Sequence, residues 1–229
     1  MPTRAPRFSA GTLKFLRALK RNNRRDWFNA HRDEYDTYVH QPMTAVIARL
    51  ADDFRAFAPE LVASPKVSMY RIYRDTRFSE NKAPYKTHAA AVFPTRGLPK
   101  HEGAGLYFHV SPEGVWIGGG IYSPQPPQLH AIREHIASNL KHLRAIVESR
   151  GFRRLVGALE GDKLQRVPRG FPKDHEAAEY LKFRRFIAGA EFPAAFAASP
   201  KFHGTLLSVF RRVMPLARFL NAPLVGQTR

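Results

Sequence analysis

The chain has 229 residues, of which 44% are hydrophobic and 24% are charged, and it contains no cysteine. A chain of this length and composition buries a sizeable core without covalent staples, which argues against intrinsic disorder. The absence of cysteine excludes disulfides, thiolate catalysis, cysteine-type zinc sites and iron–sulfur clusters, and it is typical of a reducing compartment. We therefore expect a cytoplasmic protein that holds neither a metal nor another cofactor.

The formal charge is +18, with 37 basic and 19 acidic residues, which favours polyanionic partners. A diffuse basic bias is the alternative explanation, but the excess is densest in residues 67–100, which hold 7 basic and 2 acidic residues. No window reaches the roughly 18 apolar residues that a bilayer-spanning helix needs. Residues 1–25 carry Arg or Lys every few positions, so the sequence predicts neither a secretory signal nor a membrane anchor.

The N-terminal part of the chain has helical periodicity. Ser9 precedes leucines at helical spacing and is the expected N-cap of a first helix. A second helix is expected to start near Asn23 or Arg24. A third covers residues 43–57, where apolar positions recur at i, i+3, i+4 and i+7. Pro42 either kinks the second helix or opens the third.

The period changes to two at Val67, and the alternation predicts a strand over Val67–Arg74. Further strands are expected at residues 88–93, 104–111 and 114–122, and a hairpin turn joins the last two. The consecutive glycines at 118–120 lie inside the last of these strands, where they indicate a bulge or a tight packing contact. The middle of the chain is therefore expected to form a mainly antiparallel sheet.

The C-terminal part is again mostly helical, with a strand expected at residues 183–188. Helices are expected at 129–149, 152–159 and 202–220, and a helical turn is expected to be capped by Asp174. Helices, then strands, then helices predict a single α+β domain over residues 1–229, whose sheet is packed by N- and C-terminal helices. Residues 1–7 and 221–229 are expected to be flexible tails.

Five cations lie within the 16 residues Arg71–Lys86, which we call the basic segment. Arginine makes bidentate contacts with phosphate or carboxylate, lysine supplies a mobile charge, and tyrosine donates a hydroxyl or stacks. The segment therefore predicts a strand and loop that cradle a small phosphorylated or other anionic ligand. The residues expected to bind this ligand are Arg71, Tyr73, Arg74, Arg77, Lys82, Tyr85 and Lys86.

Two other interpretations of the basic segment remain open. Aromatic residues among the cations are also typical of a nucleic-acid-binding surface. Alternatively, Asp75 and Glu80 pair with neighbouring cations, and the segment is a structural salt-bridge frame of an interaction module. Two acids cannot neutralise five cations, which favours the anion site. The sequence establishes neither a reaction nor an oligomeric state.

Two further features could take part in function. Arg169 and Lys173 lie in a loop beside the expected helix start at Asp174, and a helix N-terminus adds positive potential, so this loop is expected to complete the anion site. His88 and His109, both on predicted strands, are candidates for a general acid or base, with partnered structural histidines as the alternative.

Several blocks of sequence, spread over nearly the whole chain, occur together in one known family. They are Asn22-Asn23 with Trp27-Phe28 and Tyr35, the basic segment, Gly105–Phe108 with Gly118–Pro124, and Pro168–Phe171 with Asp174-His175 and Leu181–Phe186. With these blocks the chain resembles the uncharacterised family catalogued as domain of unknown function 2461. The resemblance implies no established activity, cofactor or catalytic residue, and it indicates that the basic segment is a family signature.

Overall fold

A computed structural model describes residues 5–225, which form two compact units. The first unit comprises Met1–Val92, Tyr107–Ile117 and Glu191–Leu207. The second unit comprises Phe93–Leu106, Gly118–Ala190 and Ser208–Arg229. Cooperative folding of residues 1–229 as one domain, which the sequence suggests, stays a prediction.

The strands form a four-stranded antiparallel sheet with the order β1-β2-β3-β4. They are β1 (Ala89–Phe93), β2 (Gly105–Val110), β3 (Gly114–Ile121) and β4 (Phe186–Pro193). The predicted hairpin turn joins β2 to β3, and the Ser111 amide donates to the Gly114 carbonyl at 2.9 Å. The α+β class and the antiparallel sheet are thus confirmed.

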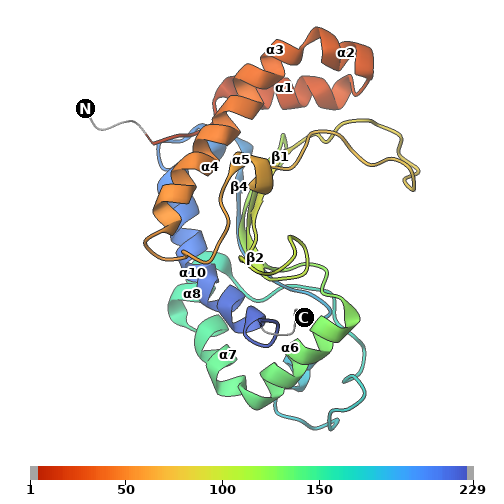
Figure 1. Cartoon of the computed structure of the whole chain (residues 1–229), viewed down its shortest axis with the longest axis vertical. Coiled ribbons are helices and arrows are strands. Elements are labelled where there is room, and N and C mark those ends of the chain that lie inside the picture. The colour runs from red at the N-terminus through yellow and green to blue at the C-terminus, as the bar shows by residue number, and fades with distance from the viewer. Residues whose placement is uncertain (1–4, 226–229) are drawn as a thin grey trace. The chain divides into compact units, whose positions relative to one another are not determined.

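The first unit contains the N-terminal helices, drawn in red and orange in Figure 1. Ser9 precedes α1 (Ala10–Arg21), and its amide donates to the Thr12 hydroxyl at 3.2 Å, half of a capping box. Pro42 lies in the first turn of α4 (Gln41–Phe54), whose predicted apolar stripe is buried. The other helices of this unit are α2 (Arg25–Ala30), α3 (Arg32–Tyr35), a π-helix (Asp36–His40), α5 (Pro65–Ser68) and a 3₁₀-helix (Ala194–Ala198).

A phenylalanine cluster forms part of the core of the first unit. The rings of Phe8 and Phe202 meet edge to face at 5.5 Å, and Phe108 of β2 lies 6.5 and 6.1 Å from them. All three side chains are at most 2% exposed, so they remove a large apolar area from water. Since side chains alternate along a strand, burial of Phe108 turns Tyr107 and His109 to the opposite face of β2.

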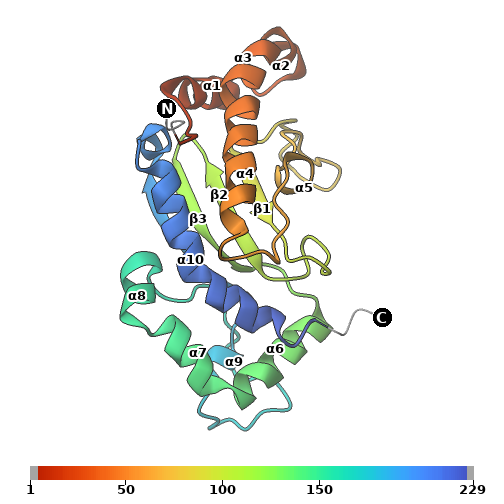
Figure 2. The same cartoon turned by 60° about the vertical axis from the view of Figure 1, so that its left-hand side comes forward.

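The second unit contains the helices labelled α6 to α9 in Figure 2 and the C-terminal part of α10. The helix predicted over residues 129–149 is in fact two, because the Asn139 amide donates back to the His135 carbonyl at 3.0 Å and ends α6. None of the described helices has the length and apolarity that crossing a membrane requires. Their bounds are α6 (Pro126–Ser138), α7 (Leu140–Val147), α8 (Arg150–Val156), α9 (Ala178–Leu181) and α10 (Phe202–Asn221).

The expected C-terminal tail, residues 221–229, starts too early. Asn221 is 4% exposed, and its amide donates to the Thr95 hydroxyl and the Ala104 carbonyl, both at 2.9 Å. Leu224 is 3% exposed, so the fold extends at least to this residue. Residues 226–229, like residues 1–4 of the expected N-terminal tail, lie outside the described part of the chain.

The strand predicted over Val67–Arg74 is wrong. The Ser64 hydroxyl accepts from the Val67 amide and caps the short helix α5, which occupies the first residues of the expected strand. Beyond α5, the described pairing is limited to isolated bridges, Met69 with Ala91 and Tyr73 with Tyr85. The basic segment is therefore a loop whose two arms pair with each other at Tyr73 and Tyr85, while the residue that pairs with β1, Met69, lies just before it.

Gly119 and Gly120 of β3 are packed too closely for any side chain, as one of the two sequence interpretations expected. A Cβ on Gly119 would lie 2.4 Å from the Gly105 carbonyl oxygen. A Cβ on Gly120 would lie 2.0 Å from the Phe186 carbonyl oxygen, and Gly120 has φ of +125°, a region that side chains disfavour. These glycines let β3 approach both neighbouring strands.

We expect Gly120→Ala to lower the free energy of unfolding by at least about 2 kcal/mol, because it adds backbone strain and a steric overlap. Gly204→Ala in α10 is the matched control: its Cβ would meet nothing within 4 Å. Alanine favours the helix there and should raise stability by up to about 1 kcal/mol. Urea unfolding of both variants measures the change in unfolding free energy. Equal changes in the two variants would contradict the conclusion that Gly120 is packed too closely for a side chain.

Candidate functional site

The basic segment is anchored to the N-terminal helices through Asn23. The Asn23 side chain donates to the Tyr85 carbonyl at 2.9 Å and accepts from the Tyr85 amide at 3.0 Å. The Tyr85 ring stacks on Phe28 with a centroid distance of 4.1 Å and is 3% exposed. Tyr85, predicted to bind a ligand, therefore serves as a buried anchor of the segment.

Four of the five predicted cations bind groups of the segment itself, and two of these, Arg74 and Lys82, bind within its loop. Arg74 donates to the Ala83 carbonyl and to the Ser79 hydroxyl, both at 3.3 Å. Lys82 donates to the Thr76 carbonyl at 3.1 Å. These contacts span the loop, so Arg74 and Lys82 stabilise its conformation.

Arg77 forms an exposed pair with Asp75, whose oxygen lies 2.8 Å from an Arg77 nitrogen. The hydrogen bonds from Arg77 lower the pKa of Asp75 to about 2. The neighbouring Phe78 is 96% exposed, and the Arg77 guanidinium lies 5.7 Å from its ring centroid. This part of the segment is the yellow loop between α5 and β1 in Figure 1.

Lys86 lies at the other end of the segment. Its ammonium group donates to the Arg71 carbonyl at 3.0 Å and lies 5.1 Å from the Tyr70 ring centroid. Lys86 therefore places a positive charge at the foot of the loop, beside β1.

Arg71 and Tyr73 line a pocket of about 250 Å³ in the first unit. Arg32 of α3 contributes a second guanidinium, and none of the lining residues is Asp or Glu. Within residues 5–225, neither arginine lies within ion-pair distance of a carboxylate. The polar and aromatic side chains of the wall are Phe28, Arg32, Tyr35, His40, Tyr70, Arg71 and Tyr73.

Sequence reasoning missed Arg32, since nothing in the periodicity of the N-terminal helices singles it out. Its neighbour Tyr35 keeps its proton, because burial and the charge of Asp36 raise the pKa of the phenol to about 12. The pocket therefore offers guanidinium and neutral hydroxyl donors, a combination suited to phosphate or carboxylate oxygens.

Arg169 and Lys173 belong to the second unit, and both are exposed. The helical turn expected at Asp174 is wrong, because α9 begins at Ala178 and has only four residues. Among the described residues, no helix therefore begins at Asp174 to add positive potential beside these two cations. Their participation in the anion site stays a prediction.

The face of β2 and β3 that points away from the phenylalanine core carries a chain of half-buried rings. Tyr107 lies 5.7 Å from Trp116 and 5.7 Å from His109, and its hydroxyl is 3.1 Å from His109 Nδ1. His109 in turn lies 5.6 Å from His88, and Tyr107 lies 6.3 Å from Tyr70 of the pocket wall. We call these five side chains the ring surface.

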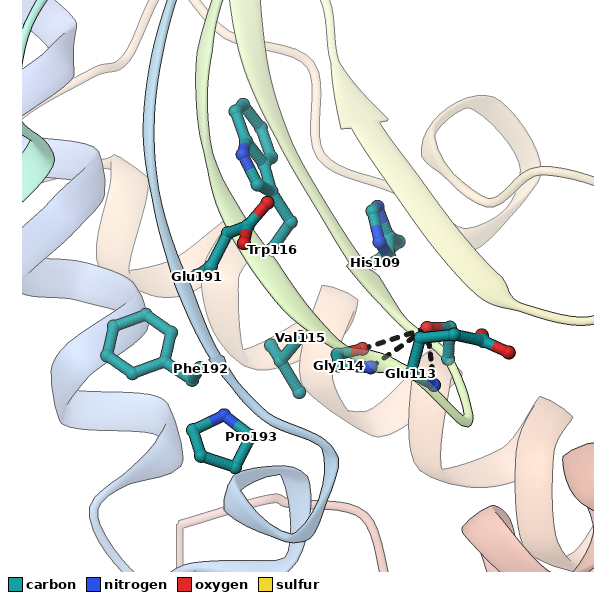
Figure 3. Close-up of a pocket in the computed structure, with 9 residues that line it drawn as sticks. His109, Glu113, Gly114, Val115, Trp116, Glu191, Phe192 and Pro193 are labelled. Carbon is teal, nitrogen blue, oxygen red and sulfur yellow. Dashed lines mark hydrogen bonds between the residues drawn. The ribbon is translucent and has the colours of Figure 1, made fainter.

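A hollow of about 410 Å³ lies at one end of the ring surface. Figure 3 shows Trp116 of β3 and His109 of β2 on one side of the sheet, with Glu191 of β4 beside Trp116. Glu113 also lines the hollow, but Lys20 pairs with it and lowers the pKa of its carboxyl group. In the described chain no group of three or more His, Asp or Glu side chains is placed to hold a metal ion.

Asn23→Ala should detach the basic segment from the helices, because it leaves both polar groups of the Tyr85 backbone without their partner. We expect a loss of about 1–3 kcal/mol in unfolding free energy and faster amide hydrogen exchange at Tyr85. Asn29→Ala, an exposed position on α2, is the control and should change neither quantity. Unchanged exchange in Asn23→Ala would show that this anchor is dispensable.

A known family model matches most of the chain. A family model described as "Conserved hypothetical protein (DUF2461)" matches residues 11–219. No curated protein and no solved structure matches the chain. The matched residues include the basic segment, the Arg32 pocket and the ring surface, and the chain belongs to the DUF2461 family of conserved hypothetical proteins.

Proposed function

We propose that this protein binds a small phosphorylated or other anionic ligand in the pocket between the basic segment and α3. Arg71 of the segment and Arg32 of α3 are the cations that contact the ligand. The pocket with two arginines and no carboxylate in its wall carries the proposal. A guanidinium group without an ion-pair partner at a pocket wall gains more from an incoming anion than one already neutralised.

The size and lining of the pocket support a small ligand. A volume of about 250 Å³ is below the range of about 300–1,000 Å³ typical of sites for drug-sized molecules. Tyr70 and Tyr73 add aromatic walls, and Tyr73 is 45% exposed. The favoured ligand is thus a phosphate or carboxylate carried on a compact organic group.

The cations of the basic segment divide between two roles in this proposal. Arg74 and Lys82 hold the loop in shape through its own carbonyl and hydroxyl groups, whereas the structural-frame interpretation expected acidic partners for these cations. Arg71 has no such partner in the described chain and is assigned to the ligand. One segment therefore contains both the cations that stabilise the loop and the cation that contacts the ligand.

Arg71→Ala and Arg32→Ala should each abolish stabilisation by phenyl phosphate and pyrophosphate. A ligand present at 100 times its Kd adds about 2.7 kcal/mol to the unfolding free energy, which thermal unfolding detects. Arg17→Ala removes an exposed cation of α1 and should leave the full response. A response that persists in both pocket variants would remove the pocket from the proposal, and a flat wild-type response would remove the binding function.

Nucleic-acid binding is a second candidate, favoured by one observation. Phe78 is 96% exposed beside Arg77, an arrangement typical of side chains on which bases stack. Phe78→Ala should then weaken binding of a single-stranded oligonucleotide by about 1–3 kcal/mol without changing the salt slope. Equal affinity of wild type and variant in a fluorescence titration at several salt concentrations would exclude this role of the loop.

A further inference from the structure

His88, which immediately precedes β1, and His109 of β2 form a pair on the ring surface. Their ring centroids are 5.6 Å apart and the ring planes are tilted by 53°. Both side chains are half-buried, so neither is sealed from a ligand. In the part of the chain that the structure describes, no group hydrogen-bonds the His88 ring. The His88 ring nitrogens are therefore left to bond with solvent or with a ligand.

The basic segment contributes a cation to this pair. Burial, the neighbouring His109 and the charge of Lys86 lower the pKa of His88 to about 4, so this imidazole is neutral at pH 7. A phosphate group placed among Lys86, His88 and His109 would offset the repulsion between Lys86 and either imidazole in its protonated form. The titratable and charged groups that face His88 are Tyr35, His40, Tyr70, Lys86, His109 and Glu113.

His109 has a different environment from His88. Its Nδ1 lies 3.1 Å from the Tyr107 hydroxyl, which accepts from Nδ1–H when the ring is protonated, so the proton that the ring can transfer is the one on Nε2. Burial lowers the pKa of His109, and Glu113 counteracts this effect. The groups that face His109 are His88, Tyr107, Glu113 and Glu191.

We propose that His88 and His109 are a catalytic base and acid that hydrolyse a phosphate diester held beside Lys86. The inference rests on the proposed anion binding and adds a reaction to it. His88 has a free imidazole to accept a proton, whereas Tyr107 orients His109 to deliver one from Nε2. Two imidazoles in unlike environments are the arrangement that acid–base catalysis needs.

The reaction needs water as its only co-reactant. His88 takes a proton from water while the water oxygen bonds to phosphorus, and the phosphorus–oxygen bond to the leaving group breaks. Protonated His109 gives its proton to the departing oxygen, so the products are a phosphate monoester and an alcohol. Proton exchange with solvent then restores both imidazoles. No electron transfer is involved, and Lys86 offsets charge on the phosphate oxygens.

The surroundings of the pair indicate the substrate class. The pocket that contains Arg71 shares Tyr70, His40 and Met69 with the narrow cavity lined by His88. On the other side, His109 and Trp116 line the hollow of about 410 Å³. A diester with a planar organic group on one oxygen therefore finds an aromatic wall on either side of the histidine pair.

Two diesters with different leaving groups test the assignment. Bis(p-nitrophenyl) phosphate releases a stable phenolate that needs no acid, whereas opening of 2′,3′-cyclic AMP releases an alkoxide that does. His88→Asn should lower both rates by about 10²-fold or more, and His109→Asn should lower only cyclic AMP opening by that factor. His130→Asn, an exposed residue of α6, is the control and should retain both rates.

His88→Gln and His109→Gln serve as second variants, and the melting temperature of each protein verifies folding. Folded His88 variants that keep the wild-type rate on both diesters would overturn the proposal. Equal losses on both substrates in His109 variants would overturn its role as the acid. If a contaminating enzyme caused the hydrolysis, every variant would retain the wild-type rate. That result would also overturn the assignment of His88 and His109.

The pH profile of the wild-type protein provides a test independent of any substitution. His88 must be neutral, which holds above about pH 4, and His109 must be protonated, which holds below its lowered pKa. For cyclic AMP, kcat/KM should therefore be at least about tenfold higher at pH 5.5 than at pH 8. A profile that rises toward pH 8 would overturn the assignment.

Failure of the reaction is distinguishable from failure of binding. If phenyl phosphate stabilises the protein but neither diester is hydrolysed between pH 4.5 and pH 8.5, the acid–base pair is overturned and the proposed ligand binding stands. If phenyl phosphate also gives no stabilisation, both are overturned. Hydrolysis that is lost in Arg71→Ala and in His88→Asn alike supports both.

Discussion

One-sided burial of β2 and β3 is the constraint on which the candidate site depends. Phe108 packs against Phe8 and Phe202, and strand alternation then fixes Tyr107 and His109 on the opposite face. Apolar burial thereby positions polar side chains that stabilise little by themselves. A register shift of one residue would send the imidazole into the phenylalanine core and the phenyl ring into water.

The basic segment obtains its shape from contacts at its ends and within its loop. Asn23 holds the backbone of Tyr85, and the stacked ring of Phe28 excludes water from that anchor. Inside the loop, side-chain cations satisfy carbonyl groups that strand pairing would otherwise occupy. Much of the charge that the sequence concentrates here thus orders the loop. Of the other cations, Arg71 lines the pocket and Lys86 lies beside the ring surface.

Periodicity and the turn residues predicted the antiparallel sheet, and periodicity predicted the apolar stripe of α4 and the bounds of α10 to within about one residue. It failed over Val67–Arg74, because the Ser64 cap and Pro65 favour a helical turn that competes locally with strand alternation. The basic segment was found from composition, but the directions of its side chains depend on loop contacts that no local pattern encodes. Arg32 was missed for a related reason: its place beside Arg71 results from tertiary packing of α3.

The central claim is that Arg32 and Arg71 form one anion-binding pocket. A crystal structure of the protein with tungstate, a phosphate-like anion located by its anomalous scattering, tests it most directly. We predict tungstate within hydrogen-bond distance of both guanidinium groups, with the tyrosine hydroxyls of the pocket wall as neighbours. Tungstate bound only at other places, with the two guanidinium groups directed apart, would contradict the account.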